Sequence, residues 1–168
     1  MASREGRLNA AIALREHGEH IAACTALSAL SRDYPDDSEV LFQCAWAHDK
    51  AEMEAEALPF YERALAVPGL NDRQRQEALL GMGSTYRVLG RASDAVRVLE
   101  RAVEEFPADN ALRVFLAMAR FDAGHRSAAF GALLFLLGEL ADDAAIHDYR
   151  RPIAQYADSY LRSDRVSD

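Results

Sequence analysis

The chain has few of the residues that mark metal, redox and membrane proteins. Only two cysteines occur among its 168 residues, and Cys24 and Cys44 fit no metal-ligand or redox spacing. The longest apolar run, residues 128–137, is far too short to span a bilayer. No apolar stretch precedes Leu8, so we expect no signal peptide. These absences predict a soluble, cytoplasmic protein that does not enter the membrane.

Positive charge is also scarce. The chain has 19 Lys and Arg against 27 Asp and Glu, a formal net charge of −8, and Lys50 is its single lysine. Surfaces that track phosphates or anionic lipids need clustered positive charge. The sequence therefore predicts neither nucleic-acid binding nor membrane-surface binding, and we interpret the acidity as a solvated helical surface.

Motifs that carry catalysis are missing as well. The sequence has no nucleophile–base pair, glycine-rich phosphate loop or zinc motif. His17 and His20 are three residues apart, but Gly18 lies between them and should break the helix, so they are poor metal ligands. Glu52, Glu54 and Glu56 alternate between faces and are interpreted as solvated positions. We predict no enzyme, no cofactor and no metal.

What the sequence does contain is a helical repeat. Leu, Ala, Glu and Arg are abundant, which favours helix by intrinsic propensity. Residues 76–107 carry regularly spaced landmarks: Leu79, Met82, Gly83, Tyr86, Gly90, Ala95, Leu99, Ala102 and Pro107. Matching landmarks recur 38 residues earlier, a further 34 residues earlier, and 34 residues later. The repeat therefore predicts units that start near residues 4, 38, 76 and 110, with an insertion around 68–73.

The landmarks fit a pair of packed helices. Leu79, Met82, Gly83 and Tyr86 lie at i, i+3, i+4 and i+7, so they line one helix face. The ends of the helices are marked by three further sets of residues. Glycines with positive φ are expected after the first helices, at Gly18, Gly90 and Gly124. Prolines are expected to end the second helices, at Pro35 and Pro107. N-cap side chains are expected before the next first helices, at Asp37 or Ser38, Asn71 or Asp72, and Asp109. Glu52 stands where the second unit should have its glycine.

The stretch 76–107 resembles the tetratricopeptide repeat at essentially every signature position, and the nearest subset is the short bacterial tetratricopeptide proteins. The resemblance implies an all-α, right-handed superhelical solenoid of antiparallel hairpins, with four hairpins in residues 4–141. An amphipathic helix in 142–163 is expected to cap the array, with Pro152 either kinking it or lying in its first turn. Residues 1–3 and 164–168 are expected to be disordered.

The resemblance also implies that the first helices line a concave wall. They carry a second apolar stripe, offset by one residue: Leu8, Ile12, Phe42, Trp46, Leu80, Val114, Met118 and Phe121. These residues are either extra core covered by adjacent hairpins or an exposed groove. The groove interpretation gives a set of candidate partner-binding residues: Phe42, Trp46, Leu80, Ser84, Arg87, Met118 and Phe121. The basic clamp with which some family members grip chaperone tails is absent, since its positions hold residues such as Gln43 and Glu77.

The second helix of the fourth unit is apolar nearly all round, which predicts burial on more than one side. With the C-terminal helix it supplies a candidate cap or symmetric-dimer surface: Phe130, Leu134, Leu137, Ile153 and Tyr156.

Three functions are compatible with this pattern. The first is an adaptor whose groove holds a peptide or helix of a partner protein. The second is a small acidic chaperone of the secretion type, which holds a partly unfolded client. The third is a self-associating structural module whose groove is filled by its own C-terminal helix. Each implies a protein or peptide partner, and the third a homodimer or larger assembly.

Overall fold

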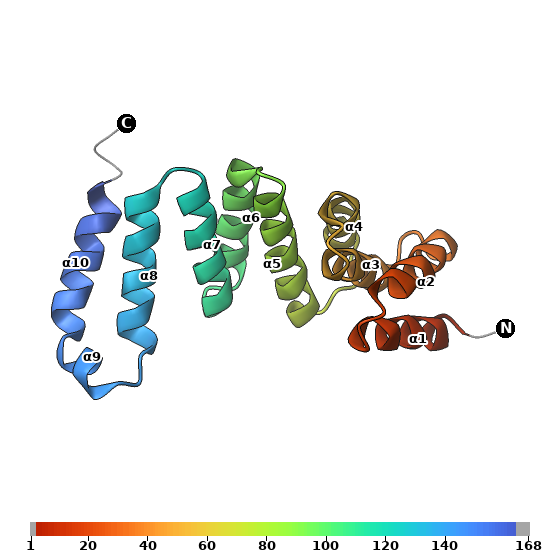
Figure 1. Ribbon diagram of the computed structural model, residues 1–168, viewed down its shortest axis with the longest axis horizontal. Helices are drawn as coiled ribbons and strands as arrows, with labels where there is room; N and C mark the ends of the chain where they lie inside the picture. Colours follow the sequence, from red (N-terminus) through yellow and green to blue (C-terminus); the bar gives the residue numbers. More distant parts are fainter. Residues whose placement is uncertain (1–2, 164–168) are drawn as a thin grey trace. The chain divides into compact units, whose positions relative to one another are not determined.

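The computed structural model describes residues 3–163, and all the regular structure in that range is helical (Figure 1). The helices are α1 (Arg4–Glu16), α2 (His20–Asp33), α3 (Ser38–Lys50), α4 (Glu54–Ala66), α5 (Asp72–Val88), α6 (Ala92–Glu105), α7 (Asn110–Asp122), α8 (Arg126–Leu140), α9 (Ala144–Asp148) and α10 (Arg150–Ser163). The chain is therefore all-α, as the repeat predicts.

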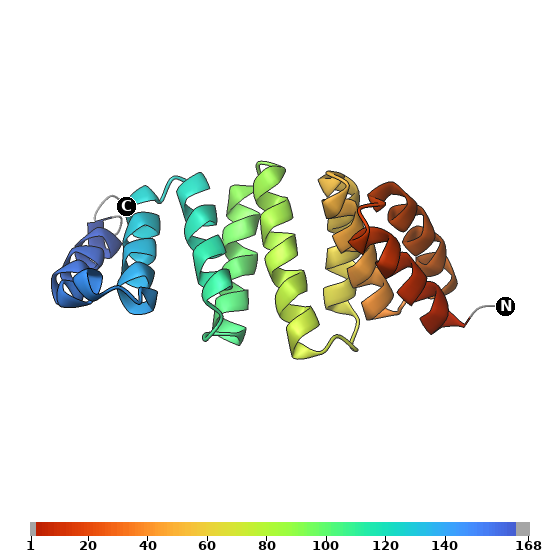
Figure 2. The ribbon, with the colours of Figure 1, turned by 60° about the horizontal axis from the view of Figure 1, so that its bottom comes forward.

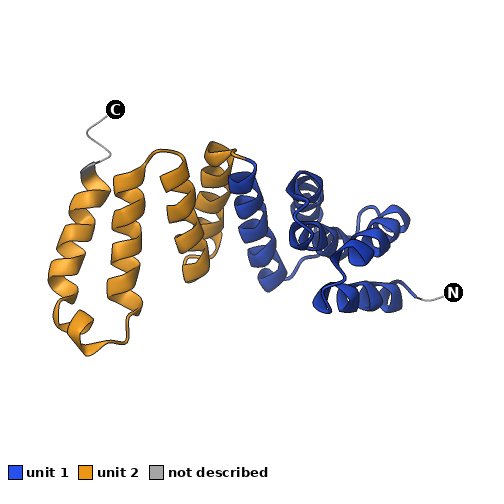
Figure 3. Cartoon of the chain, in the orientation of Figure 1, with its two compact units in different colours: residues 1–89 blue, residues 90–168 orange. Residues whose placement is uncertain are grey.

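The helices form two compact units, residues 1–89 and 90–168 (Figure 3). In unit 1 the first helices of the hairpins pack in sequence, α1 on α3 and α3 on α5. The second helices α2 and α4 each pack on the first helix before them and on the one after them. In unit 2, α7 contacts α6 and α8, and α8 lies beside α10 in both views (Figures 1 and 2).

The turns inside the hairpins share one backbone conformation. The second residue after each first helix has a positive φ, which is 83° at Gly18, 72° at Gly90 and 95° at Gly124. In the second hairpin the same conformation is held by Glu52, with a φ of 58°. A side chain in this left-handed region crowds its own backbone, so the second turn is strained where the others are not.

The first helices begin at side-chain caps. Asp37 and Asp109 accept hydrogen bonds from the first-turn amides of α3 and α7, and Asn71 forms a reciprocal capping box with Gln74. This box starts α5 at Asp72, after an N-cap expected from the sequence and four residues before the repeat start near 76. The four extra residues therefore form one additional turn of helix, which makes α5 17 residues long where α1, α3 and α7 have 13.

The C-terminal segment forms two helices, the short α9 and the longer α10, which has Pro152 in its first turn. α10 runs antiparallel to α8 and packs closely at two glycines. A Cβ atom on Gly131 would lie 2.7 Å from the Ala157 carbonyl oxygen, and one on Gly138 would lie 3.3 Å from Ile153. At the other terminus Ser3 is ordered and caps α1. Residues 1–2 and 164–168 of the expected disordered ends lie outside the described residues.

Candidate functional site

Trp46 is held between two side chains on the face where α1 and α3 meet. The guanidinium carbon of Arg15, on α1, lies 3.9 Å from the centroid of the indole ring. The Phe42 ring, one turn earlier on α3, is 5.5 Å away and tilted by 31°. The indole itself remains partly exposed. A fixed, partly exposed aromatic side chain is well suited to anchor a partner, because little side-chain entropy is lost on binding.

Arg15 is a charged residue that is only 7 % exposed. Its Nη1 donates to the Gln43 side-chain oxygen, and its Nη2 lies 3.9 Å from a Glu16 carboxylate oxygen. Burial lowers the pKa of Arg15, although an arginine still stays protonated at neutral pH. Arg15 was not among the residues predicted from the sequence. The signal was available, because Arg15, Asp49 and Arg87 occupy the same position in successive repeats.

Phe42 and Leu8 were expected on the apolar stripe of the groove, but both are buried in the structure. Phe42 is 1 % exposed and packs with Tyr61 and Ala78 in the core between α3, α4 and α5. Leu8 is 2 % exposed and belongs to the core of the first hairpin. The extra-core interpretation is therefore correct for both, and Phe42 supports Trp46 from behind.

The remaining candidates of unit 1 lie along α5. Leu80, Ser84 and Arg87 are spaced at i, i+4 and i+7, and all three are partly buried. Ser84 occupies on α5 the repeat position that Trp46 occupies on α3, and these two helices pack on each other. We call Trp46, Leu80 and Ser84 together the Trp46 surface.

A buried polar cluster fixes α3, α4 and α5 next to this surface. The Asp49 carboxylate accepts hydrogen bonds from the Tyr61 hydroxyl at 2.6 Å and the Thr85 hydroxyl at 2.9 Å. Burial raises the pKa of Asp49, and the two hydroxyl donors partly offset that rise. Gly81 makes room for the Tyr61 hydroxyl, which would lie 2.3 Å from a Cβ atom at that position. Thr85 and Gly81 are therefore needed for the packing of α5, in addition to its apolar residues.

Met118 and Phe121, the candidates from the fourth hairpin, belong to unit 2. They are 37 % and 53 % exposed, and the Arg126 guanidinium carbon lies 5.5 Å from the Phe121 ring centroid. Both side chains are more open than Trp46.

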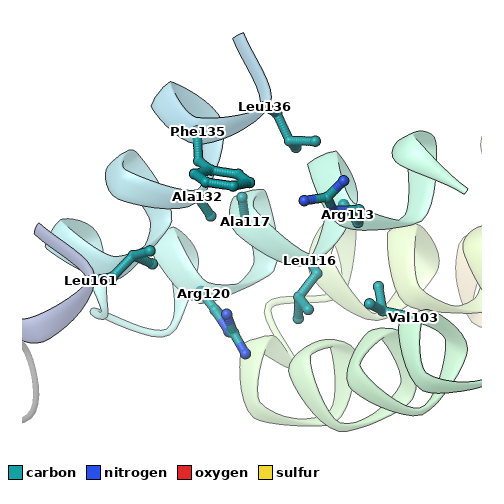
Figure 4. A pocket seen from close by; sticks show the side chains of 9 residues that line it. All are labelled: Val103, Arg113, Leu116, Ala117, Arg120, Ala132, Phe135, Leu136 and Leu161. Atoms are coloured by element: carbon teal, nitrogen blue, oxygen red, sulfur yellow. The ribbon is translucent and has the colours of Figure 1, made fainter. Parts of the chain in front are cut away.

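A hollow of about 260 Å³ lies between α7 and α8 and reaches Leu161 of α10 (Figure 4). Two arginines border it, but both are ion-paired. Arg113 lies 3.2 Å from Glu139, and Arg120 lies 2.9 Å from Glu100. The hollow therefore offers apolar lining rather than an unpaired charge for an anion.

The candidate cap or dimer surface divides into covered and open residues. Leu134 and Ile153 are partly buried, and Ile153 packs on Gly138 at the α8–α10 contact. Phe130, Leu137 and Tyr156 are exposed by 52 %, 49 % and 66 %. Phe130 also makes an edge-to-face contact with Tyr160, with ring centroids 4.9 Å apart.

Among residues 3–163, no group of three or more His, Cys, Asp or Glu side chains is placed so that it could hold a metal ion. His48 is buried, and its ring Nδ1 lies 2.7 Å from the Cys44 carbonyl oxygen. Within the same range no helix is long and apolar enough to cross a membrane.

A family model described as a tetratrico peptide repeat matches residues 38–160. The chain belongs to the tetratricopeptide repeat family. A search of curated proteins returned no significant match. Proteins built from tetratricopeptide repeats are in general protein-interaction modules rather than enzymes. The matched range begins with α3 and ends within α10, so it includes Trp46, Leu80 and Ser84.

Proposed function

We propose that this tetratricopeptide protein is an adaptor that binds a peptide or helix of a partner protein on the Trp46 surface. The observation that carries the proposal is the indole of Trp46, kept partly exposed between the buried Arg15 and Phe42. The Arg15 guanidinium loses solvation where it lies against the indole ring. Packing of the first hairpin core alone would not require this loss.

The chemistry of the partner follows from the surface. Trp46 and Leu80 offer apolar contacts, and Ser84 offers a hydroxyl group. Glu77 stands one turn before Leu80 and pairs with Arg73 at 3.0 Å. We therefore expect a peptide with one or two large apolar side chains and no dense negative charge.

The alternative in which the chain fills its own groove is not favoured. α10 is already packed on α8, where Ala157 is 0 % exposed.

Site-specific photo-crosslinking tests the proposal. A benzophenone amino acid is placed at Leu80 or at Ser84, and as a matched control at Ile21, which is 64 % exposed on the second helix α2. After irradiation in the source cells, crosslinked proteins are identified by mass spectrometry. We expect the same partner at positions 80 and 84 and none at position 21.

Binding of a synthetic segment from that partner then gives the affinity. Trp46→Ala should weaken it about tenfold or more, since one large apolar anchor is worth roughly 1.5–3 kcal/mol. Equal affinity for Trp46→Ala and the wild type, with unchanged circular dichroism, would reject the Trp46 surface as the binding site. If the segment competes for the Trp46 surface only in its unfolded form, the protein acts as a chaperone for a partly unfolded client.

A further inference from the structure

The fourth hairpin leaves uncovered the face on which, in the earlier hairpins, the next hairpin docks. Leu27, Tyr61, Leu99 and Leu133 occupy one repeat position on α2, α4, α6 and α8. Their side chains are 0 %, 2 %, 0 % and 38 % exposed. In unit 1 this position faces the following first helix, since Tyr61 packs on Gly81 of α5.

Neighbouring positions show the same contrast. Cys24 of α2 is 6 % exposed and clusters with Cys44 of α3, whereas its counterpart Phe130 is 52 % exposed. Ser31 is 6 % exposed, whereas its counterpart Leu137 is 49 % exposed. The open positions on α8 are therefore those that a following helix would cover.

α10 does not supply that helix. It packs on Gly131 and Gly138, whose counterparts in the other hairpins, such as Thr25 and Arg97, face solvent. The contact of Tyr160 with Phe130 shows that α10 borders the open face without covering it.

The open face carries an uninterrupted apolar stripe. Phe130, Leu133, Leu137 and Leu140 are spaced by three, four and three residues, the spacing at which two helices pack along a seam. Leu140 is 55 % exposed, and Tyr156 of α10, 66 % exposed, lies one turn from Tyr160 on the same side of α10. We call the four stripe residues and Tyr156 the end face.

We propose that the end face binds the end face of a second copy of this chain, with the two α8 helices antiparallel about a twofold axis. In this arrangement Leu133 meets Leu137 of the second copy, and Phe130 meets its Leu140. Each contact is made twice, as a twofold interface requires.

Area favours a second copy as the occupant. Taking about 200 Å² for a fully exposed large side chain, the end face leaves roughly 500 Å² of apolar surface. Two copies would bury roughly 1,000 Å² of it, which with the surrounding polar rim reaches the lower end of specific interfaces.

Charge favours the antiparallel orientation. Arg126 lies at the start of α8 and Asp142 follows its end, and both are exposed. Antiparallel pairing brings Arg126 of one copy to Asp142 of the other, at both ends of the seam. Parallel pairing would place like charges together.

Sedimentation equilibrium over about 1–200 µM chain tests the proposal, because a face of this size should give a reversible dimer with a micromolar dissociation constant. The wild type should dimerise. Leu137→Glu should remain monomeric with unchanged circular dichroism, since its side chain is half exposed in the monomer. Ile21→Glu, on an exposed apolar residue of α2, should dimerise like the wild type. A monomeric wild type or a dimeric Leu137→Glu variant would overturn the proposal.

A charge exchange tests the orientation independently. Arg126→Glu should weaken the dimer about tenfold, and Arg126→Glu with Asp142→Arg should return the dissociation constant to within about threefold of the wild-type value. A structural role of Arg126 through its contact with Phe121 would give no such recovery, and an unrecovered double variant would overturn the antiparallel arrangement. Trp46→Ala should leave the dimer unchanged, so failure of this inference and failure of the proposed adaptor function are distinguishable.

Discussion

Asp49 is the residue whose surroundings differ most from those of a surface carboxylate. It lies on α3 and receives two hydroxyl donors, one from α4 and one from α5. The donors stabilise its charge, but burial outweighs them and raises its pKa. Its burial is not visible in the spacing of α3, because the partners that enclose it are 12 and 36 residues away.

The raised pKa makes Asp49 a pH-dependent contribution to stability. A carboxyl group whose pKa is higher in the folded state contributes stability that is present at low pH and lost as the pH rises through that pKa. Asp49→Asn keeps an acceptor for Tyr61 and removes the charge. The stability of Asp49→Asn relative to the wild type should therefore be greater at pH 7 than at pH 4, as measured by urea titration. A difference independent of pH would contradict the argument.

Gly81 is required by a close contact rather than by its backbone angles. Gly81→Ala would place a methyl group against the Tyr61 hydroxyl. The hydroxyl would then be pushed away from Asp49, to which it donates a hydrogen bond. We expect a loss of about 2 kcal/mol or more in the free energy of unfolding. Gly6→Ala, whose new methyl group would meet only Ser3 Oγ at 3.4 Å, is the matched control and should be neutral or stabilising. Equal effects of the two substitutions would exclude the steric explanation.

Among the elements, the hairpin turns show that a repeat can keep a conformation after losing the residue that favours it. Glu52 takes the backbone conformation that glycine holds in the other three hairpins. The flanking helices α3 and α4 impose this conformation, because the Met53 amide still donates to the His48 carbonyl across the turn.

Glu52→Gly should therefore stabilise the protein. Relief of the left-handed conformation, less the greater flexibility of glycine in the unfolded chain, gives an expected gain of about 1 kcal/mol by thermal or chemical denaturation. The reverse change, Gly90→Ala, should cost a similar amount. Destabilisation by Glu52→Gly would mean that the Glu52 side chain makes a contribution that outweighs its strain.

At the scale of the elements, part of the helical structure could be predicted from the sequence and part could not. The repeat landmarks predict helical hairpins and the N-caps of α3, α5 and α7, because spacing along the chain determines which residues share a helix face. The insertion around 68–73 does not by itself show where the extra residues go, and the Asn71–Gln74 capping box, at one of the expected N-cap positions, places them in the first turn of α5. The burial of Phe42 and Arg15 depends on how neighbouring hairpins pack, and a pattern within one helix does not specify that.

For the molecule as a whole, α8 depends on contacts with two neighbours. α7 covers one side and α10 covers the side that carries Gly131 and Gly138. Removal of residues 142–168 should therefore leave α8 covered on one side only, and we expect aggregation, measured by light scattering. Gly131→Leu in the intact chain should act in the same way, because even a Cβ atom there would lie 2.7 Å from the Ala157 carbonyl oxygen. A well-behaved truncated chain would contradict this dependence on α10.

The position of α10 beside the docking positions of α8, rather than over them, has a consequence for protein engineering. Nothing in residues 3–163 occupies the seat that a fifth hairpin would take next to Leu133. A fifth hairpin joined through a flexible linker would therefore need no change to α10, but its first helix would have to fit Phe130 and Leu137 where α3 fits the smaller Cys24 and Ser31.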